Sequence, residues 1–188
     1  MTGRIQLELE AQAFAEAAAR PPLLFTLGPE QGRLALEEAQ SGQVSTLPVD
    51  IEDLTIADGP SAQVALRILR PPHVQAPLPV IVYIHGAGWV FGSKQTHDRL
   101  IRELAVGAGA AVVFPEYRLC PEARYPTALE ECYSVAQWVA GHGREHGLDA
   151  EHLAMAGDSA GGNMAAVVTL LSRERGDRTS SSSCSSTR

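Results

Sequence analysis

The chain has 188 residues, of which 45% are hydrophobic and 20% charged, and this suits one soluble domain or part of a larger one. Fifteen basic and 22 acidic residues give a net charge of −7, which disfavours nucleic acid and anionic membranes as partners. Three cysteines without paired spacing indicate neither a disulfide framework nor a metal site, so we expect no metal and no other cofactor. The charged N-terminal stretch and the lack of an apolar run of spanning length predict a cytoplasmic protein with no membrane span.

Two helices are predicted at the start of the chain. The first covers residues 5–19 and ends at a pair of prolines, and the second covers residues 29–40. The first has four expected apolar anchors: Ile5, Leu9, Ala13 and Phe14.

A β-hairpin is predicted next, with strands at 49–56 and 63–69 and a turn at Asp58-Gly59-Pro60. Buried strands then alternate with helices, a pattern typical of a parallel sheet with helices on both faces. Thr127 and Glu130 have the spacing of a capping box at the start of one helix. The expected strands cover 80–84, 110–114 and 152–156, and the expected helices cover 97–106, 127–140 and 160–173.

The strongest chemical signal is Gly157-Asp158-Ser159-Ala160-Gly161, which fits the pattern G-x-S-x-G. A predicted strand precedes it and a predicted helix follows it. This is the context of a nucleophile elbow, a tight turn that exposes a serine hydroxyl. The alternative interpretation is a Gly-Ser turn that only caps the helix. The flanking elements favour Ser159 as a catalytic nucleophile.

A second signal, His85-Gly86-Ala87-Gly88-Trp89, follows the strand predicted at 80–84. Acyl transfer creates an oxyanion that needs backbone N–H donors already aimed at it. Small residues let the backbone approach a substrate oxygen, as the H-G-G-G loop does in lipases and esterases. The alternative is a plain glycine-rich turn. His85 itself is expected to be structural rather than a general base.

A third signal, Tyr117 to Glu122 followed by Tyr125-Pro126, is interpreted as a structural loop in which Arg118 and Glu122 could pair. The three signals together, in this order and spacing, resemble the hormone-sensitive-lipase-like carboxylesterases of the α/β-hydrolase fold.

The resemblance implies a site and a substrate class. Ser159 would be the nucleophile, and the N–H groups of Gly86, Ala87 and Ala160 would be the oxyanion donors. Small-molecule esters with short acyl chains would be the substrates. Residues 1–45 would form a helical cap segment, and 46–176 the first part of the α/β-hydrolase core.

A serine nucleophile needs a base and an orienting acid, which follow the serine in the chain order of this fold. All six histidines precede Ser159, and His97 is the nearest candidate among them. The resemblance places the acid and the histidine beyond residue 188. We therefore expect a chain that is incomplete at its C-terminus and inactive as printed.

The serine-rich tail, residues 177–188, has little to bury and is predicted to be disordered. Our hypothesis for its origin is a frameshift or a mis-called reading frame, and the alternative is a natural disordered tail. Two further functions stay open: a non-catalytic ligand-binding relative, and a thioesterase or peptidase on the same fold. The oligomeric state is not predicted.

Overall fold

The computed structural model describes residues 7–42, 45–57, 63–75, 77–176 and 182–183. A central sheet has the strand order β1-β2-β4-β3-β5-β6. Its strands are β1 (Asp50–Ile56), β2 (Val64–Arg70), β3 (Leu78–Ile84), β4 (Ala111–Glu116), β5 (Leu148–Gly157) and β6 (Ser182–Ser183).

The sheet combines an antiparallel hairpin with a parallel part. β1 pairs antiparallel with β2, and β2 pairs antiparallel with β4. β3 lies parallel to both β4 and β5, and β5 lies parallel to β6. The predicted hairpin and the mostly parallel α/β sheet are thus confirmed. The expected turn at 58–60 lies outside the described residues.

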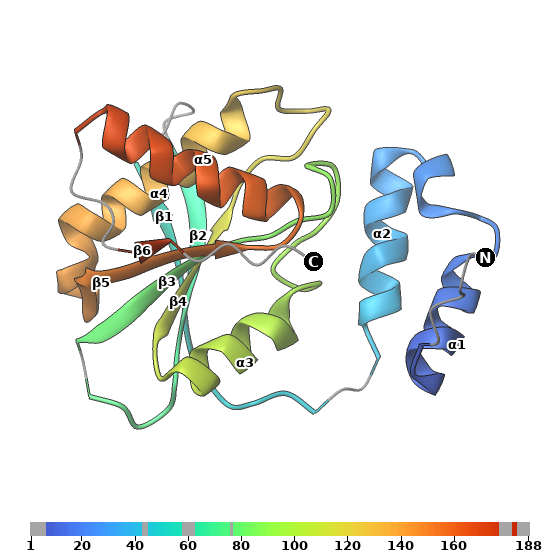
Figure 1. Cartoon of the computed structure of the whole chain (residues 1–188), viewed down its shortest axis with the longest axis horizontal. Coiled ribbons are helices and arrows are strands. Elements are labelled where there is room, and N and C mark those ends of the chain that lie inside the picture. The colour runs from blue at the N-terminus through green and yellow to red at the C-terminus, as the bar shows by residue number, and fades with distance from the viewer. Residues whose placement is uncertain (1–6, 43–44, 58–62, 76, 177–181, 184–188) are drawn as a thin grey trace, which may run out of the picture.

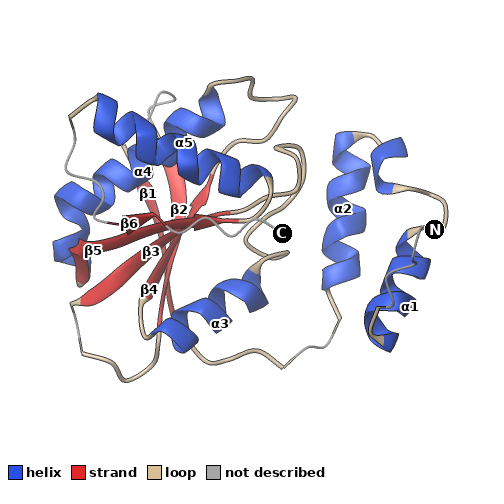
Figure 2. Cartoon of the chain, viewed as in Figure 1, coloured by secondary structure: helices blue, strands red, loops and turns tan. Residues whose placement is uncertain are grey.

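Helices cover both faces of the sheet, as predicted (Figure 1). α4 and α5 pack on one face over the larger apolar cluster, and α3 packs on the other face through Ile101 and Ala105. Figure 2 shows the same layers by type of element. The helices are α1 (Leu9–Ala18), α2 (Pro29–Gln40), α3 (Asp98–Ala108), α4 (Thr127–His142) and α5 (Ala160–Glu174), with short 3₁₀ turns at Leu24–Thr26 and Gly143–His146.

The strands that carry the two chemical motifs, β3 and β5, lie next to each other at the centre of the sheet. Their register pairs Ile84 with Gly157, the last residue of each strand. Because the carboxyl ends of parallel strands meet at one edge, the loop after β3 and the turn after β5 meet there too. In open α/β sheets this edge is where ligands bind.

The N-terminal helices α1 and α2 lie to one side of the sheet (Figure 1). α1 buries no residue, so the prediction of Leu9, Ala13 and Phe14 as apolar anchors was wrong, and Leu9 and Phe14 are 87% and 68% exposed. The fourth expected anchor, Ile5, lies outside the described residues. Helical periodicity identifies a face of a helix but not the surface that covers it.

Two predicted side-chain contacts are also corrected. The chain enters α4 with Pro126 at the N-cap, so Thr127 is already helical and caps nothing, while Glu130 pairs with Arg175 at 2.8 Å. Arg118 binds the buried Glu131 at 2.7 Å instead of Glu122.

The tail expected to be disordered is described only at 182–183, which form β6 beside β5; its other residues lie outside the described part of the chain.

Candidate active site

Ser159 lies at the sharp turn that sequence patterning predicted for it. β5 ends at Gly157, α5 begins at Ala160, and Ser159 between them has φ 50° and ψ −119°. A non-glycine residue in this region is strained, and such strain persists only where the surroundings fix the backbone. The turn has the strand–turn–helix form of a nucleophile elbow.

The two motif glycines allow the backbone of the turn to touch the backbone of β3. A Cβ atom at Gly157 would lie 2.5 Å from the Ile84 carbonyl oxygen. A Cβ atom at Gly161 would overlap the same oxygen and also the His85 carbonyl group. Only glycine fits at these positions, and the close approach brings the elbow against the loop that follows β3.

That loop, the HGAG loop (residues 85–89), has three consecutive residues in the left-handed region. Their φ values are 71° at Ala87, 67° at Gly88 and 61° at Trp89. The Ala87 carbonyl accepts a hydrogen bond from the Phe91 N–H at 3.1 Å, and the Trp89 carbonyl accepts one from the Cys120 N–H at 2.8 Å. Backbone donors thus hold two carbonyl groups of this left-handed segment.

Asp158, the residue before the elbow serine, ties the elbow to the HGAG loop. Its Oδ1 accepts hydrogen bonds from the Gly86 N–H and the Tyr83 hydroxyl, both at 2.9 Å, and lies 3.6 Å from His97 Nε2. Burial acts to raise the pKa of this carboxyl group, but the bonds from His97 and Tyr83 outweigh it and lower the pKa to about 2. Asp158 is therefore an ionised acceptor at neutral pH.

His85 is a buried structural residue, as expected. Its ring is stacked on Tyr117 at 4.3 Å and on Phe114 at 5.3 Å between centroids, and its Nδ1 lies 3.0 Å from the Gly86 carbonyl oxygen. The Tyr117 hydroxyl donates to the His85 carbonyl at 2.8 Å. Burial lowers the pKa of His85 to about 4, so the ring is neutral at pH 7.

This buried histidine predicts acid-sensitive stability. The unfolded ring binds its proton near pH 6.5 and the folded ring only near pH 4, so the contribution of His85 is present above pH 6.5 and is lost as the pH falls to 4. The loss is about 3 kcal/mol of unfolding free energy. Urea unfolding at several pH values gives the unfolding free energy as a function of pH. Between pH 6.5 and 4 this free energy should fall less steeply for His85→Gln than for the unmutated chain. The same substitution at exposed His152 is the control, and an equal slope for His85→Gln and the unmutated chain would contradict the assignment.

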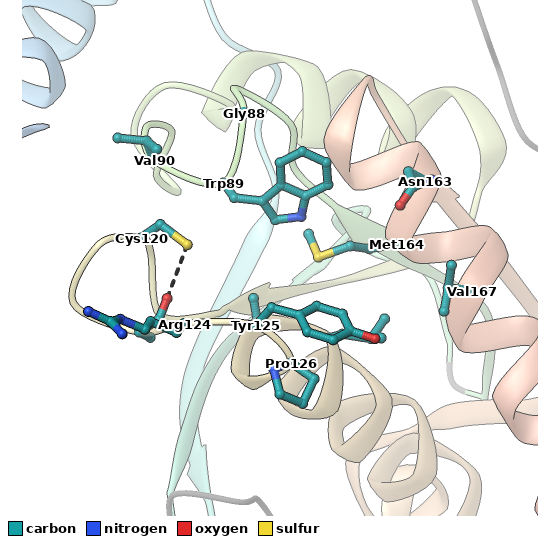
Figure 3. Close-up of a pocket in the computed structure, with 13 residues that line it drawn as sticks. Gly88, Trp89, Val90, Cys120, Arg124, Tyr125, Pro126, Asn163, Met164 and Val167 are labelled. Atoms are coloured by element: carbon teal, nitrogen blue, oxygen red, sulfur yellow. Dashed lines mark hydrogen bonds between the residues drawn. The ribbon is translucent and has the colours of Figure 1, made fainter.

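A cavity of about 560 Å³ opens beside the HGAG loop (Figure 3). Its walls come from this loop, from the segment 120–129 and from α5, which Figure 3 shows through Trp89, Tyr125 and Met164 respectively. Most lining side chains are apolar, including Trp89, Val90, Leu129, Met164 and Val167. Apolar walls with a few polar groups are typical of small-molecule sites.

Comparison with known proteins identifies the family. A family described as alpha/beta hydrolase fold matches residues 81–183, which include both motifs. The chain belongs to the α/β-hydrolase family. Its resemblance to carboxylesterases of this family is confirmed by similar proteins. Esterase LipI of Mycobacterium tuberculosis is 41% identical over 180 residues, which are 89% of this chain and 56% of LipI. Carboxylesterase NlhH of the same species is 39% identical over 157 residues, which are 82% of this chain and 49% of NlhH.

Solved structures agree with the α/β-hydrolase assignment. A thermostable esterase from Pseudomonas putida superposes with a TM-score of 0.87 and 41% identity, covering 97% of this chain and 57% of that one. This chain therefore spans about half the length of the relatives that it matches.

The four predicted site residues of this α/β hydrolase differ in what their backbones do. Ser159 and Ala160 form the elbow and Ala87 lies in the HGAG loop, but the Gly86 N–H already donates to Asp158. Across the described residues, the N–H groups of Ala87, Gly88 and Ala160 donate no hydrogen bond to protein atoms. Among the described residues, the N–H groups without a protein acceptor at the carboxyl ends of β3 and β5 are therefore those of Ala87, Gly88 and Ala160, whereas Asp158 binds the Gly86 N–H.

His97, the candidate base of the sequence analysis, lies beside Asp158. Its Nε2 faces Asp158 at 3.6 Å, and its Nδ1 lies 2.9 Å from Thr96 Oγ1. Within the part of the chain that is described, no hydrogen bond joins His97 to Ser159. This arrangement suits a structural role for His97 better than the role of base.

Sequence reasoning missed Asp158 and Tyr83, because their contacts depend on the β3–β5 pairing. The described residues contain no group of three or more His, Cys, Asp or Glu placed to hold a metal ion. No helix in these residues is long and apolar enough to cross a membrane.

Proposed function

We propose that this α/β hydrolase carries the nucleophile and the oxyanion donors of a carboxylic ester hydrolase. The observation that supports this most directly is the strained Ser159 at the elbow, joined through Asp158 to a loop with free N–H groups. The similarity to LipI and NlhH supports the same reaction class.

In the proposed reaction, Ser159 Oγ attacks the carbonyl carbon of the ester. The N–H groups of Ala87, Gly88 and Ala160 stabilise the oxygen that becomes negative, and each such donor is worth about 3 kcal/mol. The alcohol leaves, and water then releases the acid from the acyl-serine. The Gly86 N–H is assigned to loop structure, since Asp158 occupies it.

The proton of Ser159 must pass to a general base. The printed chain has no histidine after Ser159, and none before it bonds to this serine among the described residues. We therefore propose that the 188-residue chain by itself has no Ser159-dependent turnover.

The proposed substrates are small esters with an apolar acyl or alcohol group. The cavity of about 560 Å³ with apolar walls supports this class, because an ionic group there would lose its hydration. The N-terminal segment 1–45 is proposed as a cap beside this cavity, and a cytoplasmic location stays a prediction.

A chimera tests the proposed function. Residues 1–176 are followed by the part of LipI that comes after its match to this chain, and hydrolysis of p-nitrophenyl butyrate is measured. The chimera should turn over the ester, and Ser159→Ala should lower kcat by about 10³-fold or more.

Ser134→Ala is the matched control, because Ser134 bonds to the Glu130 carbonyl inside α4 and lies outside the proposed site. The 188-residue chain should equal its own Ser159→Ala variant. Turnover in the chimera that survives Ser159→Ala would refute the assignment of the nucleophile.

A further inference from the structure

One side chain of the N-terminal segment, Arg33 of α2, holds the backbone of two distant loops. Its Nε donates to the Val90 carbonyl and its Nη2 to the Cys120 carbonyl, both at 2.8 Å. The same guanidinium forms a two-point ion pair with Glu122 at 2.9 and 2.8 Å. Arg33 thus reaches the chain immediately after the HGAG loop and the segment across the cavity from it.

The two loops are also bonded to each other, which closes a ring of contacts. The Cys120 N–H donates to the Trp89 carbonyl, so both backbone groups of Cys120 are used. Together with the Phe91 N–H on the Ala87 carbonyl, these bonds occupy three of the four carbonyl groups from Ala87 to Val90. A carbonyl group fixes the plane of its peptide unit, and hence the direction of the next N–H.

The HGAG loop needs such anchoring because of its conformation. Ala87 and Trp89 are non-glycine residues at φ 71° and 61°. Left-handed residues of this kind cost on the order of 1 kcal/mol or more each and persist only where contacts impose them. The bonds from Arg33 hold Val90, the residue directly after this loop, and Cys120, which itself bonds to the Trp89 carbonyl in the loop.

Two further contacts place α2 against the same loop. Glu37 accepts a hydrogen bond from Ser93 Oγ at 2.9 Å. Gly32 lies against the ring of Phe91, where a Cβ atom would overlap the ring edge. Two successive turns of α2 therefore contact the segment that follows the HGAG loop.

We propose that Arg33 is a positioning residue that holds the HGAG loop in the conformation presenting the Ala87 and Gly88 N–H groups. Its catalytic meaning rests on the proposed function, but its structural effect can be measured without catalysis. A planar guanidinium can serve three acceptors at once, which a lysine ammonium on a flexible stem does not reproduce. The ion pair with Glu122 orients the guanidinium, and the two carbonyl bonds hold the loop.

The test uses the 188-residue chain and amide hydrogen exchange. The amides of Phe91 and Cys120 report on the loop, because each donates to one of its carbonyl groups. Arg33→Met should accelerate exchange at both amides about tenfold or more, as expected when two charge-assisted bonds are lost. The ¹H–¹⁵N signals of Ala87 and Gly88 should shift in the same variant. Arg33→Lys should recover less than half of the protection.

Three controls separate positioning from general stability. Glu122→Gln keeps both carbonyl bonds and should change exchange at Cys120 by less than about threefold. Arg175→Met removes a comparable two-point pair with Glu130, and it should leave Phe91 and Cys120 unchanged. The amide of Ile101, bonded to the His97 carbonyl in α3, should keep its rate in every variant.

The proposal is overturned if Arg33→Met leaves the Phe91 and Cys120 rates unchanged, or if Ile101 accelerates equally. It is also overturned if Glu122→Gln matches Arg33→Met, which would make the ion pair the whole effect. Should Arg33→Met fail to fold, Arg33→Lys against Glu122→Gln decides the question. Faster exchange at Cys120 in the lysine variant alone supports positioning, and equal rates in both refute it. A chimera inactive on esters would alter none of these outcomes.

Discussion

Gly161→Ala is expected to destabilise the chain by about 3 kcal/mol or more, although alanine normally favours a helix by up to about 1 kcal/mol. The added Cβ would overlap the Ile84 oxygen and the His85 carbonyl group. Both are backbone atoms at the end of a central strand, so neither can move aside without breaking the sheet register. The elbow and the HGAG loop would separate.

Gly141→Ala is the matched control. Gly141 also lies in a helix, α4, but a Cβ atom there meets nothing within 4 Å. This variant should be neutral or more stable by up to about 1 kcal/mol. Urea unfolding measures both variants. Equal midpoints for Gly161→Ala and Gly141→Ala would show that the close approach of elbow and strand is not as described.

Asp158→Ala is expected to cost about 2 kcal/mol of unfolding free energy. It leaves the Gly86 N–H and the Tyr83 hydroxyl without their acceptor, and an unsatisfied buried donor costs about 1–3 kcal/mol. Asp158→Asn keeps one acceptor oxygen and should cost about half as much. The carboxylate is 46% exposed, and solvent therefore keeps the cost below the full penalty for two buried donors.

Glu103→Ala is the control for Asp158→Ala. It removes an exposed ion pair with Arg99, of a kind worth about 0.5 kcal/mol or less. The midpoint temperature of thermal unfolding should be lowest for Asp158→Ala, higher for Asp158→Asn and highest for Glu103→Ala. Equal midpoint temperatures for Asp158→Ala and Glu103→Ala would show that Asp158 does not join the elbow to the HGAG loop.

Local sequence signals predicted most of the fold and the strand–turn–helix form of the chain at Ser159. The elbow around Ser159 follows from a motif whose glycines and flanking elements are adjacent in sequence, and the helix at 29–40 was predicted at its observed bounds. The buried strands were recognisable because short apolar runs between turn signals have few alternative structures.

Contacts between distant segments were beyond such signals. Arg33 binds the carbonyl groups of Val90 and Cys120, which lie 57 and 87 positions further along the chain. The sequence of the helix at 29–40 contains no feature that marks this arginine. Arg118 pairs with Glu131 of α4 and not with Glu122, which is nearer in sequence. α4 buries the Glu131 carboxylate beside the loop that carries Arg118. The use of the Gly86 N–H also depends on tertiary packing, since its acceptor is 72 residues away.

The most direct measurement of the central claim is the site of covalent modification by diethyl p-nitrophenyl phosphate. The reagent phosphorylates an activated serine with loss of p-nitrophenol, and the resulting diethylphosphoryl-serine resists hydrolysis. Applied to the chimera that extends residues 1–176, it should add one diethylphosphoryl group, and peptide mass spectrometry should locate the group on Ser159. The Ser159→Ala chimera should stay unmodified. Modification at another residue, or none while ester hydrolysis continues, would contradict Ser159 as the nucleophile.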